Sequence, residues 1–134
     1  FKHYNADELV GDKTMKEHLR FSVVYWHTFS NPLSDPFGMG TALRPWDDGT
    51  GSVANAQRKA RVAFEFFEKL GAPFYAFHDR DVAPEGKTIK ESHANLDEVI
   101  KVFKDEQART GGTGCCRTQG RTRPVRSRCH DRRV

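Results

Sequence analysis

Two short runs of the chain have the apolar pattern of buried β-strands. In the run 19–26, apolar side chains fall on both faces of an extended chain. One face carries Leu19, Phe21, Val23 and Tyr25, and the other carries Ser22, Val24 and Trp26. The run 73–77, Pro-Phe-Tyr-Ala-Phe, is apolar throughout. Apolar residues on both faces are typical of strands covered on both sides, as in a parallel sheet, so each run predicts a strand.

Two longer segments repeat apolar residues every three or four positions, which is the period of an amphipathic helix. The first begins at Ser52, a residue that can cap a helix, and ends at Gly71, which can adopt the left-handed stop. The second begins at Thr88, whose spacing to Glu91 is that of a capping box, and should end near 110–111. The two apolar stripes are Val53, Ala56, Ala60, Ala63, Phe67 and Leu70, widened by Phe64 and Phe66, and Leu96, Val99, Ile100 and Phe103.

The segment 29–51, between the first strand and the first helix, shows no apolar period and is rich in Pro and Gly. Loops of this length without secondary structure are usually functional or disordered. Phe37 and Trp46 lie inside it, and they either pack back on their own domain or bury against another surface. Residues 1–18 are polar, with Asn5-Ala6-Asp7 as a turn or a helix start.

The predicted elements follow one another as strand, long loop, helix, strand, loop and helix. This order is that of two consecutive βα units. Because a crossover connection places successive strands side by side in the same direction, the two strands should be parallel neighbours. The sequence therefore predicts an α/β fold for residues 1–111.

Charge and cysteine content separate the last 23 residues from the rest. Residues 112–134 hold 7 Arg, one acidic residue and all three Cys, whereas residues 1–111 hold 15 Lys and Arg against 17 Asp and Glu. The tail has no apolar period, and its Cys and His match no zinc spacing. It is interpreted either as a disordered nucleic-acid-binding arm or as an out-of-frame reading of the gene. Residues 1–111 show no basic patch that would suggest nucleic acid.

The chain has no run of 18 apolar residues, so no transmembrane helix is expected. Its first residues lack the charged-then-apolar pattern of a signal peptide, so a soluble cytoplasmic protein is the expectation. The chain begins with Phe1 and not with Met, which indicates a processed or incomplete sequence.

Candidate chemistry lies where the second strand ends, at Phe77-His78-Asp79-Arg80-Asp81. His78 and Asp81 are three positions apart, close enough for the carboxylate to orient the imidazole if the chain turns there. The alternative is a solvated, charged loop. A His and two Asp at the exit of a buried strand occupy the place where α/β enzymes hold their active sites.

The first strand ends in a similar pair, Trp26-His27. Parallel strands that both exit through an aromatic residue and a His would bring four rings to the carboxyl end of the sheet, an arrangement that suits a sugar. The alternatives are that Trp26 is a core aromatic and that His27 is a structural histidine. The sequence has no Gly-rich phosphate loop and no Gly-x-Ser-x-Gly motif.

Several longer motifs carry a resemblance to one family, covering about residues 1–111 in order. The motifs are Met15 to Phe29 (MKEHLRFSVVYWHTF), Asp35-Pro36-Phe37-Gly38, Arg44-Pro45-Trp46, Phe64 to Gly71 (FEFFEKLG), Phe77 to Gly86 (FHDRDVAPEG) and Glu91 to Glu98 (ESHANLDE). In this order they resemble the N-terminal part of xylose isomerase, in its longer, class II form. Motifs of this length are far more specific than a His-x-x-Asp spacing.

The resemblance implies a (β/α)₈ TIM barrel, of which this chain would hold the first two βα units. The family interconverts xylose with xylulose and glucose with fructose, usually as a homotetramer, using two divalent metal ions (Mg²⁺, Mn²⁺ or Co²⁺). It opens the sugar ring before a hydride shift. By resemblance, His78 opens the ring, Asp81 holds and polarises that His, Trp26 walls the sugar pocket, and Phe37 reaches into a neighbouring subunit's site.

The chain departs from the family pattern in two places. Ser30-Asn31 stand where the family commonly has Cys-Trp, and Leu33 stands where a small residue is usual, which puts the packing of this loop in question. From Gly112 onward nothing resembles the family's third strand, and the family's metal ligands and catalytic Lys are absent from this chain. The 134-residue chain is therefore expected to be inactive alone.

Two other functions remain as alternatives. One is a small nucleic-acid-binding protein that uses the Arg-rich tail. The other is a different metal-dependent barrel enzyme, such as another sugar isomerase or an abasic-site endonuclease. The Trp26-His27-Thr28-Phe29 and His78-Asp79-Arg80-Asp81 motifs together argue against the second alternative.

Overall fold

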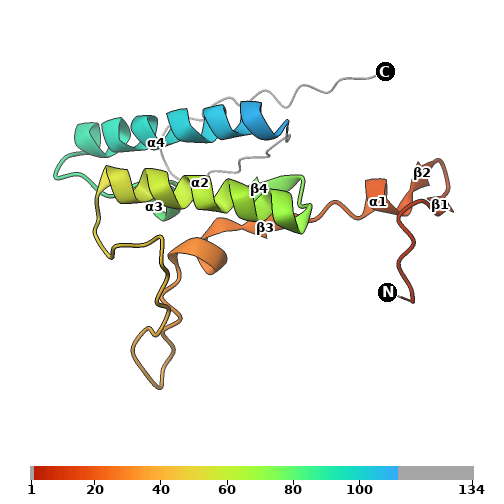
Figure 1. The fold of residues 1–134 in the computed structure, drawn as a ribbon, viewed down its shortest axis with the longest axis horizontal. Helices are drawn as coiled ribbons and strands as arrows, with labels where there is room; N and C mark the ends of the chain where they lie inside the picture. Colours follow the sequence, from red (N-terminus) through yellow and green to blue (C-terminus); the bar gives the residue numbers. More distant parts are fainter. Residues whose placement is uncertain (1, 112–134) are drawn as a thin grey trace.

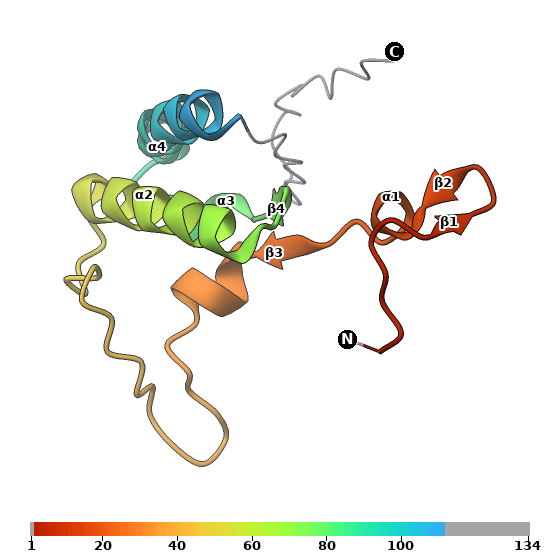
Figure 2. The same cartoon turned by 45° about the vertical axis from the view of Figure 1, so that its right-hand side comes forward.

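A computed structural model describes residues 2–111 of the chain; the Arg- and Cys-rich segment 112–134, and both interpretations of it, lie outside the described residues. The described part is a mixed α/β fold with two small sheets. Two long helices lie side by side on one side of a parallel strand pair, while the N-terminal segment and a long loop extend away from this body (Figures 1 and 2).

The parallel strand pair consists of β3 (Ser22–Val24) and β4 (Phe74–Ala76). Val23 lies opposite Tyr75, and Val24 lies opposite Ala76. The helix α2 (Val53–Leu70) connects the two strands, so the predicted parallel pairing is correct.

Both strands are shorter than the sequence pattern predicts, and the expected burial before β3 is wrong. Leu19 and Phe21 are 46% and 64% exposed, because they lie before the first residue of β3 and outside the core cluster that the helices cover. At its other end β3 stops before Tyr25, whose backbone is helical and which is the N-cap of the π-helix η1 (Trp26–Ser30). The local alternation therefore identified the strand but overestimated its length.

Helix α2 begins and ends where its capping residues predict. The side chain of Ser52 accepts a hydrogen bond from the backbone N–H of Asn55, three residues into the helix. Gly71 closes it in the left-handed conformation, with φ of 70°, which a residue with a Cβ adopts only with strain. Of the predicted stripe, Ala56, Ala60, Ala63 and Phe67 are buried together with Phe64, whereas Leu70 and Phe66 are exposed.

Helix α4 (Ile89–Thr110) also matches its prediction, with Thr88 as the N-cap. Glu91 completes only half of a capping box, because its carboxylate accepts from the N–H of Lys87 instead of Thr88. Val99 and Phe103 are buried as predicted, and Val102 is a buried residue that the predicted stripe omitted.

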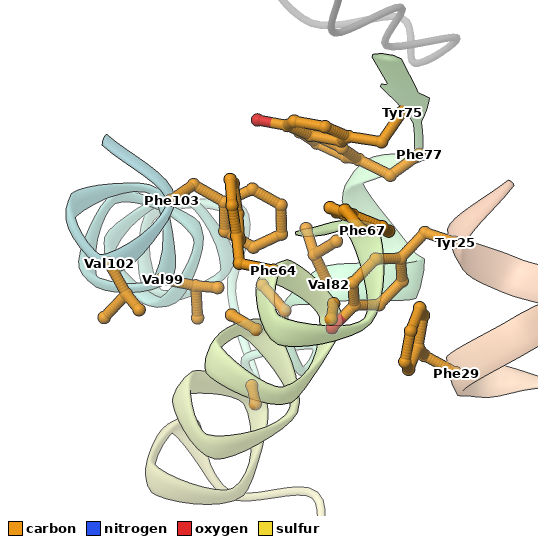
Figure 3. Packing of buried hydrophobic residues seen from close by; sticks show 14 of the residues in the cluster. Tyr25, Phe29, Phe64, Phe67, Tyr75, Phe77, Val82, Val99, Val102 and Phe103 are labelled. Carbon is orange, nitrogen blue, oxygen red and sulfur yellow. The ribbon is translucent and has the colours of Figure 1, made fainter. Parts of the chain in front are cut away.

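A cluster of aromatic rings joins the two helices to the strands (Figure 3). The ring of Phe64 on α2 lies 5.3 Å from that of Tyr75 on β4 and 5.5 Å from that of Phe103 on α4. The rings of Phe77 and Phe103 are 5.2 Å apart. Fully buried Ala60 lets α2 lie close to its neighbours, because its side chain is a single methyl group. These ring contacts link α2, α4 and β4 within one apolar core.

The N-terminal segment forms a small hairpin that the sequence analysis did not predict. Strands β1 (Leu9–Val10) and β2 (Lys13–Thr14) pair antiparallel, and the short helix α1 (Met15–His18) follows. Gly11 takes the positive φ of 69° that the tight turn needs. The side chains of β1 and β2 are mostly exposed, so the sequence there lacks the alternation of apolar and polar residues that marks a half-buried strand. None of the helices in residues 2–111 combines the length and the apolar character that crossing a membrane requires.

Phe103→Ala tests whether the aromatic cluster holds α4 to the strands. Phe103 is 2% exposed, so its truncation should cost about 3–5 kcal/mol of unfolding free energy, measured by urea denaturation of the chain. The matched control is Ile89→Ala on the same helix, where the side chain is 69% exposed and the change should stay within about 0.5 kcal/mol. Equal effects of the two substitutions would contradict this account of the core.

Candidate functional site

His78 and Asp81 form one hydrogen-bonded unit at the end of β4. The chain turns there into the short helix α3 (Asp79–Val82), with His78 as its N-cap. One carboxylate oxygen of Asp81, Oδ2, accepts from the backbone N–H of His78 at 2.8 Å and lies 2.8 Å from the imidazole Nδ1. The three-residue spacing therefore does bring carboxylate and imidazole together.

The alternative of a fully solvated loop is wrong for this segment. The side chain of Asp81 is only 16% exposed. The residues on either side of the unit are in the core, with Phe77 at 1% and Val82 at 2% exposure. These two apolar anchors fix the backbone before and after His78, which leaves the imidazole little freedom to move with the main chain.

The bonding partner of Nδ1 determines which nitrogen of His78 is free. An ionised carboxylate only accepts hydrogen bonds, so Nδ1 must donate its hydrogen to Asp81, and in the neutral imidazole Nε2 then carries the lone pair. No residue in the range 2–111 bonds Nε2, and the His78 side chain is 35% exposed. The tautomer follows from this bonding pattern. An oriented imidazole with an accessible Nε2 can accept and return a proton.

Trp26, the first residue of η1 after β3, lies against the His78 ring. The two ring centroids are 4.4 Å apart, and that of His27 lies 5.5 Å from Trp26. Three of the four expected rings therefore gather at this end of the sheet, while the fourth, Phe77, turns into the core. Trp26 is partly buried, so it is neither a core aromatic nor a free surface side chain. Its place follows from η1, because that turn begins at Trp26 directly after Tyr25.

Ser30, the last residue of η1, contacts the backbone of the His78–Asp81 unit. Its hydroxyl donates to the backbone carbonyl of Asp81 at 2.8 Å, and the guanidinium of Arg44 donates to the carbonyl of Asn31 at 2.7 Å. Ser30 and Asn31, the two residues at which the chain departs from the family pattern, thus each make a hydrogen bond. Sequence reasoning missed the role of Ser30, because a contact across 51 positions leaves no local signal.

The loop between η1 and α2 presents three apolar side chains to solvent. Phe37, Met39 and Leu43 are 96%, 89% and 97% exposed. Packing of Phe37 back on its own domain, one of the two alternatives, does not occur in the described residues. Trp46 behaves differently, since it is partly buried, and its indole N–H is buried without a partner in residues 2–111.

The C-terminal end of this loop is tied to α2 through a buried amide, that of Asn55. The Asn55 side chain, 1% exposed, donates to the Asp47 carboxylate at 2.8 Å and to the carbonyl of Thr50 at 2.9 Å. The bond from Asn55 lowers the pKa of Asp47, which keeps that carboxylate ionised beside Lys59. Asn55 was missed by sequence reasoning, although a polar residue on the apolar face of the first helical turn is a usable signal.

Tyr25 carries a second buried polar atom without a partner in the described residues, its phenolic oxygen. The residue is fully buried, and its desolvation, followed by the nearby charges of Asp81 and Asp47, raises the pKa of the phenol. The side chain therefore stays neutral. Its ring lies 5.1 Å from Phe29 and 6.0 Å from Phe103, so it connects η1 to the core (Figure 3).

Metal ligands are not assembled in the part of the chain that the structure describes. Within residues 2–111 no three His, Cys, Asp or Glu side chains lie together in a group that could hold a metal ion. His78 and Asp81 bond each other, and Arg80 pairs with Glu85. The described residues therefore do not fit the two divalent ions that the family resemblance implies.

Comparisons with known proteins place these features in a family context. No family model matches the chain. It is 61% identical over 111 residues to the xylose isomerase of Rhodopirellula baltica, a match that covers 83% of this chain and 25% of that protein. It is 57% identical over 105 residues to that of Shouchella clausii, covering 78% and 24%, and 56% identical over 111 residues to that of Agrobacterium fabrum, covering 83% and 25%.

These matches confirm the resemblance to an N-terminal fragment of xylose isomerase. The chain spans about a quarter of the length of the curated relatives it matches. Nothing in the comparisons supports the alternative of nucleic-acid binding.

Asp81→Ala tests the bonding of His78 without any substrate. Losing the acceptor should release Nδ1, so that the ring proton is shared between both nitrogens instead of residing on Nδ1. Nitrogen-15 NMR of the ring at a pH where the imidazole is neutral measures this. Asp79→Ala is the matched control on the same short helix, because within residues 2–111 the Asp79 carboxylate accepts from the N–H of Arg80 and not from His78. An Nδ1–H tautomer that persists in Asp81→Ala would disprove the assignment.

Proposed function

We propose that this chain supplies the first two βα units of a (β/α)₈ barrel in a metal-dependent xylose isomerase. The observation that carries the proposal is the pair of His78 and Asp81 beneath Trp26, at the carboxyl end of parallel strands, in a chain 61% identical to a xylose isomerase. The carboxyl end of a parallel sheet is where barrel enzymes hold their catalytic residues.

The exposed edges of β3 and β4 support a larger barrel. Within residues 2–111 each strand has one neighbour, the other strand, so each sheet edge has unpaired backbone groups. Exposed Phe21, directly before β3, is an apolar side chain without cover in these residues. Unpaired edges and uncovered apolar side chains of this kind are expected where further strands of a barrel pair.

His78 is the proposed acid–base residue for opening the sugar ring. Opening a cyclic aldose removes the proton from the hydroxyl on C1, breaks the bond between C1 and the ring oxygen, and puts a proton on that oxygen. An imidazole that donates through Nδ1 to Asp81 can accept the first proton at Nε2 and deliver it to the ring oxygen. Asp81 orients the ring and stabilises the charged imidazolium that forms in between.

Trp26 and Phe37 are proposed as substrate contacts of different kinds. Trp26 lies against His78 and would give the sugar an apolar wall, as aromatic faces commonly do for sugar C–H groups. Phe37 is 96% exposed on a long loop and would reach the sugar site of a neighbouring subunit in a homotetramer. Met39 and Leu43, which are equally exposed on the same loop, would pack against that neighbour.

The hydride shift that follows ring opening is assigned to the rest of the protein. Two divalent ions, with Mg²⁺, Mn²⁺ or Co²⁺ as candidates, would supply Lewis-acid chemistry there. Residues 2–111 hold no ligand group for them, so we route no step of the shift through this part of the chain. The 134-residue chain is accordingly proposed to contain the ring-opening residues of the site. Alone, it should form no xylulose from xylose.

A chimera tests the proposed function. Residues 1–111 replace the matching quarter of the Rhodopirellula baltica enzyme, and a coupled assay follows xylulose formation from xylose with Mg²⁺ or Mn²⁺. The chimera should be active, and His78→Gln should lower its kcat by about 100-fold or more, the usual share of acid–base catalysis. The 134-residue chain alone is assayed in parallel and should give no product.

His93→Gln serves as the matched control, since His93 is an exposed histidine on α4 that makes no hydrogen bond within residues 2–111. Its activity should equal that of the unmodified chimera. An inactive but folded chimera would contradict the assignment to xylose isomerase. A fully active His78→Gln chimera would contradict the role of His78, and product from the chain alone would contradict the division of the site.

A further inference from the structure

We propose that Ser30 is the positioning residue that holds the His78–Asp81 unit in its working geometry, an inference that rests on the proposed ring-opening function. Ser30 does not touch the imidazole. It acts on the backbone of Asp81, whose carboxylate in turn orients the ring.

The carbonyl of Asp81 needs a partner that α3 cannot supply. A helix of four residues is too short to satisfy its last carbonyl groups, which normally find water, a side chain or the next turn. Within α3 the Asp81 N–H donates to the carbonyl of His78, and the N–H of Ala83 donates to the carbonyl of Asp79. The Ser30 hydroxyl, partly buried and 2.8 Å away, is the donor that reaches the Asp81 carbonyl.

One helical turn contacts both parts of the catalytic unit. In η1 the N–H of Asn31 donates to the carbonyl of Trp26 at 2.7 Å, which closes the wide turn. The first residue of that turn, Trp26, lies against the His78 ring, and the last, Ser30, bonds the Asp81 backbone. Wide π-type turns of this kind are frequent at functional sites, where they redirect side chains.

The core fixes η1 itself. Phe29, the residue before Ser30, is 2% exposed, and its ring lies 5.1 Å from Tyr25 and 6.0 Å from Phe67 on α2. Ser30 therefore extends from a segment that Phe29 anchors in the core to the backbone of α3. The bond adds a polar contact at the Asp81 carbonyl, between the two apolar anchors Phe77 and Val82 that hold the ends of this turn in the core.

The hydroxyl matters because of its strength as a donor. A thiol is a weaker hydrogen-bond donor than a hydroxyl. Ser30 therefore gives the Asp81 carbonyl a stronger partner than Cys would. The chemistry predicts an order of Ser and Thr above Cys, and Cys above Ala, in holding the unit.

Amide hydrogen exchange in the 134-residue chain tests this order without a sugar. The N–H of His78 donates to the Asp81 carboxylate, so its exchange reports how often the unit opens. Ser30→Ala should speed this exchange about five-fold, the equivalent of one lost hydrogen bond, and Ser30→Thr should restore it. Ser30→Cys should fall between the two. Ser34→Ala is the control, because Ser34 is an exposed serine in the same loop region.

Two further readings separate positioning from general stability and from the proposed function. Exchange at Val99 in the core of α4 should stay unchanged in every variant, whereas an equal rise at Val99 would show that Ser30 only stabilises the fold. Unchanged exchange at His78 in Ser30→Ala would also overturn the proposal. In the chimera, Ser30→Ala should lower kcat on xylose with KM unchanged. If His78 proves unnecessary for turnover while the exchange results hold, the proposed function fails and the positioning contact stands.

Discussion

The parallel pairing of β3 with β4 is the constraint on which the candidate site depends. Val24 lies opposite Ala76, so the residues two positions further on, Trp26 and His78, leave the sheet at the same end. Their rings meet at 4.4 Å although 51 residues separate them in the chain. The pairing is maintained by α2 and α4, whose aromatic side chains pack on one side of the two strands (Figure 3). The packing of the core and the geometry of the candidate site therefore both follow from the register of these two strands.

The site is built outward from the buried core to an exposed imidazole nitrogen. The aromatic core holds Phe29 and Phe77, which fix the entry to α3 and the turn η1. These two segments then contact each other through Ser30 and Trp26, and the imidazole of His78 keeps one nitrogen that no residue in 2–111 bonds. Such an arrangement suits a proton-transferring group, which needs a fixed direction and an open face. The loop around Phe37 differs from the site, because its apolar side chains are exposed and would be buried only against another surface.

Local signals in the sequence predicted the helices well and the strands less well. The bounds of α2 follow from Ser52 and Gly71, because caps act within one helical turn. The strand at 19–26 was predicted too long, since alternation records which residues are apolar and not where a partner strand ends. The pairing of His78 with Asp81 was an option in the sequence, but the bonds of Ser30 and Asn55 depend on chain segments that only folding brings together.

The central claim is that these residues open the sugar ring and take no part in the hydride shift. The most direct measurement compares two substrates of the chimera: xylose, which is cyclic in solution, and D-glyceraldehyde, which is too short to close a ring. His78→Gln should lower kcat/KM for xylose by about 100-fold or more while leaving that for glyceraldehyde close to the unmodified value. An equal loss on both substrates would contradict the claim, because it would place His78 in the isomerisation step itself.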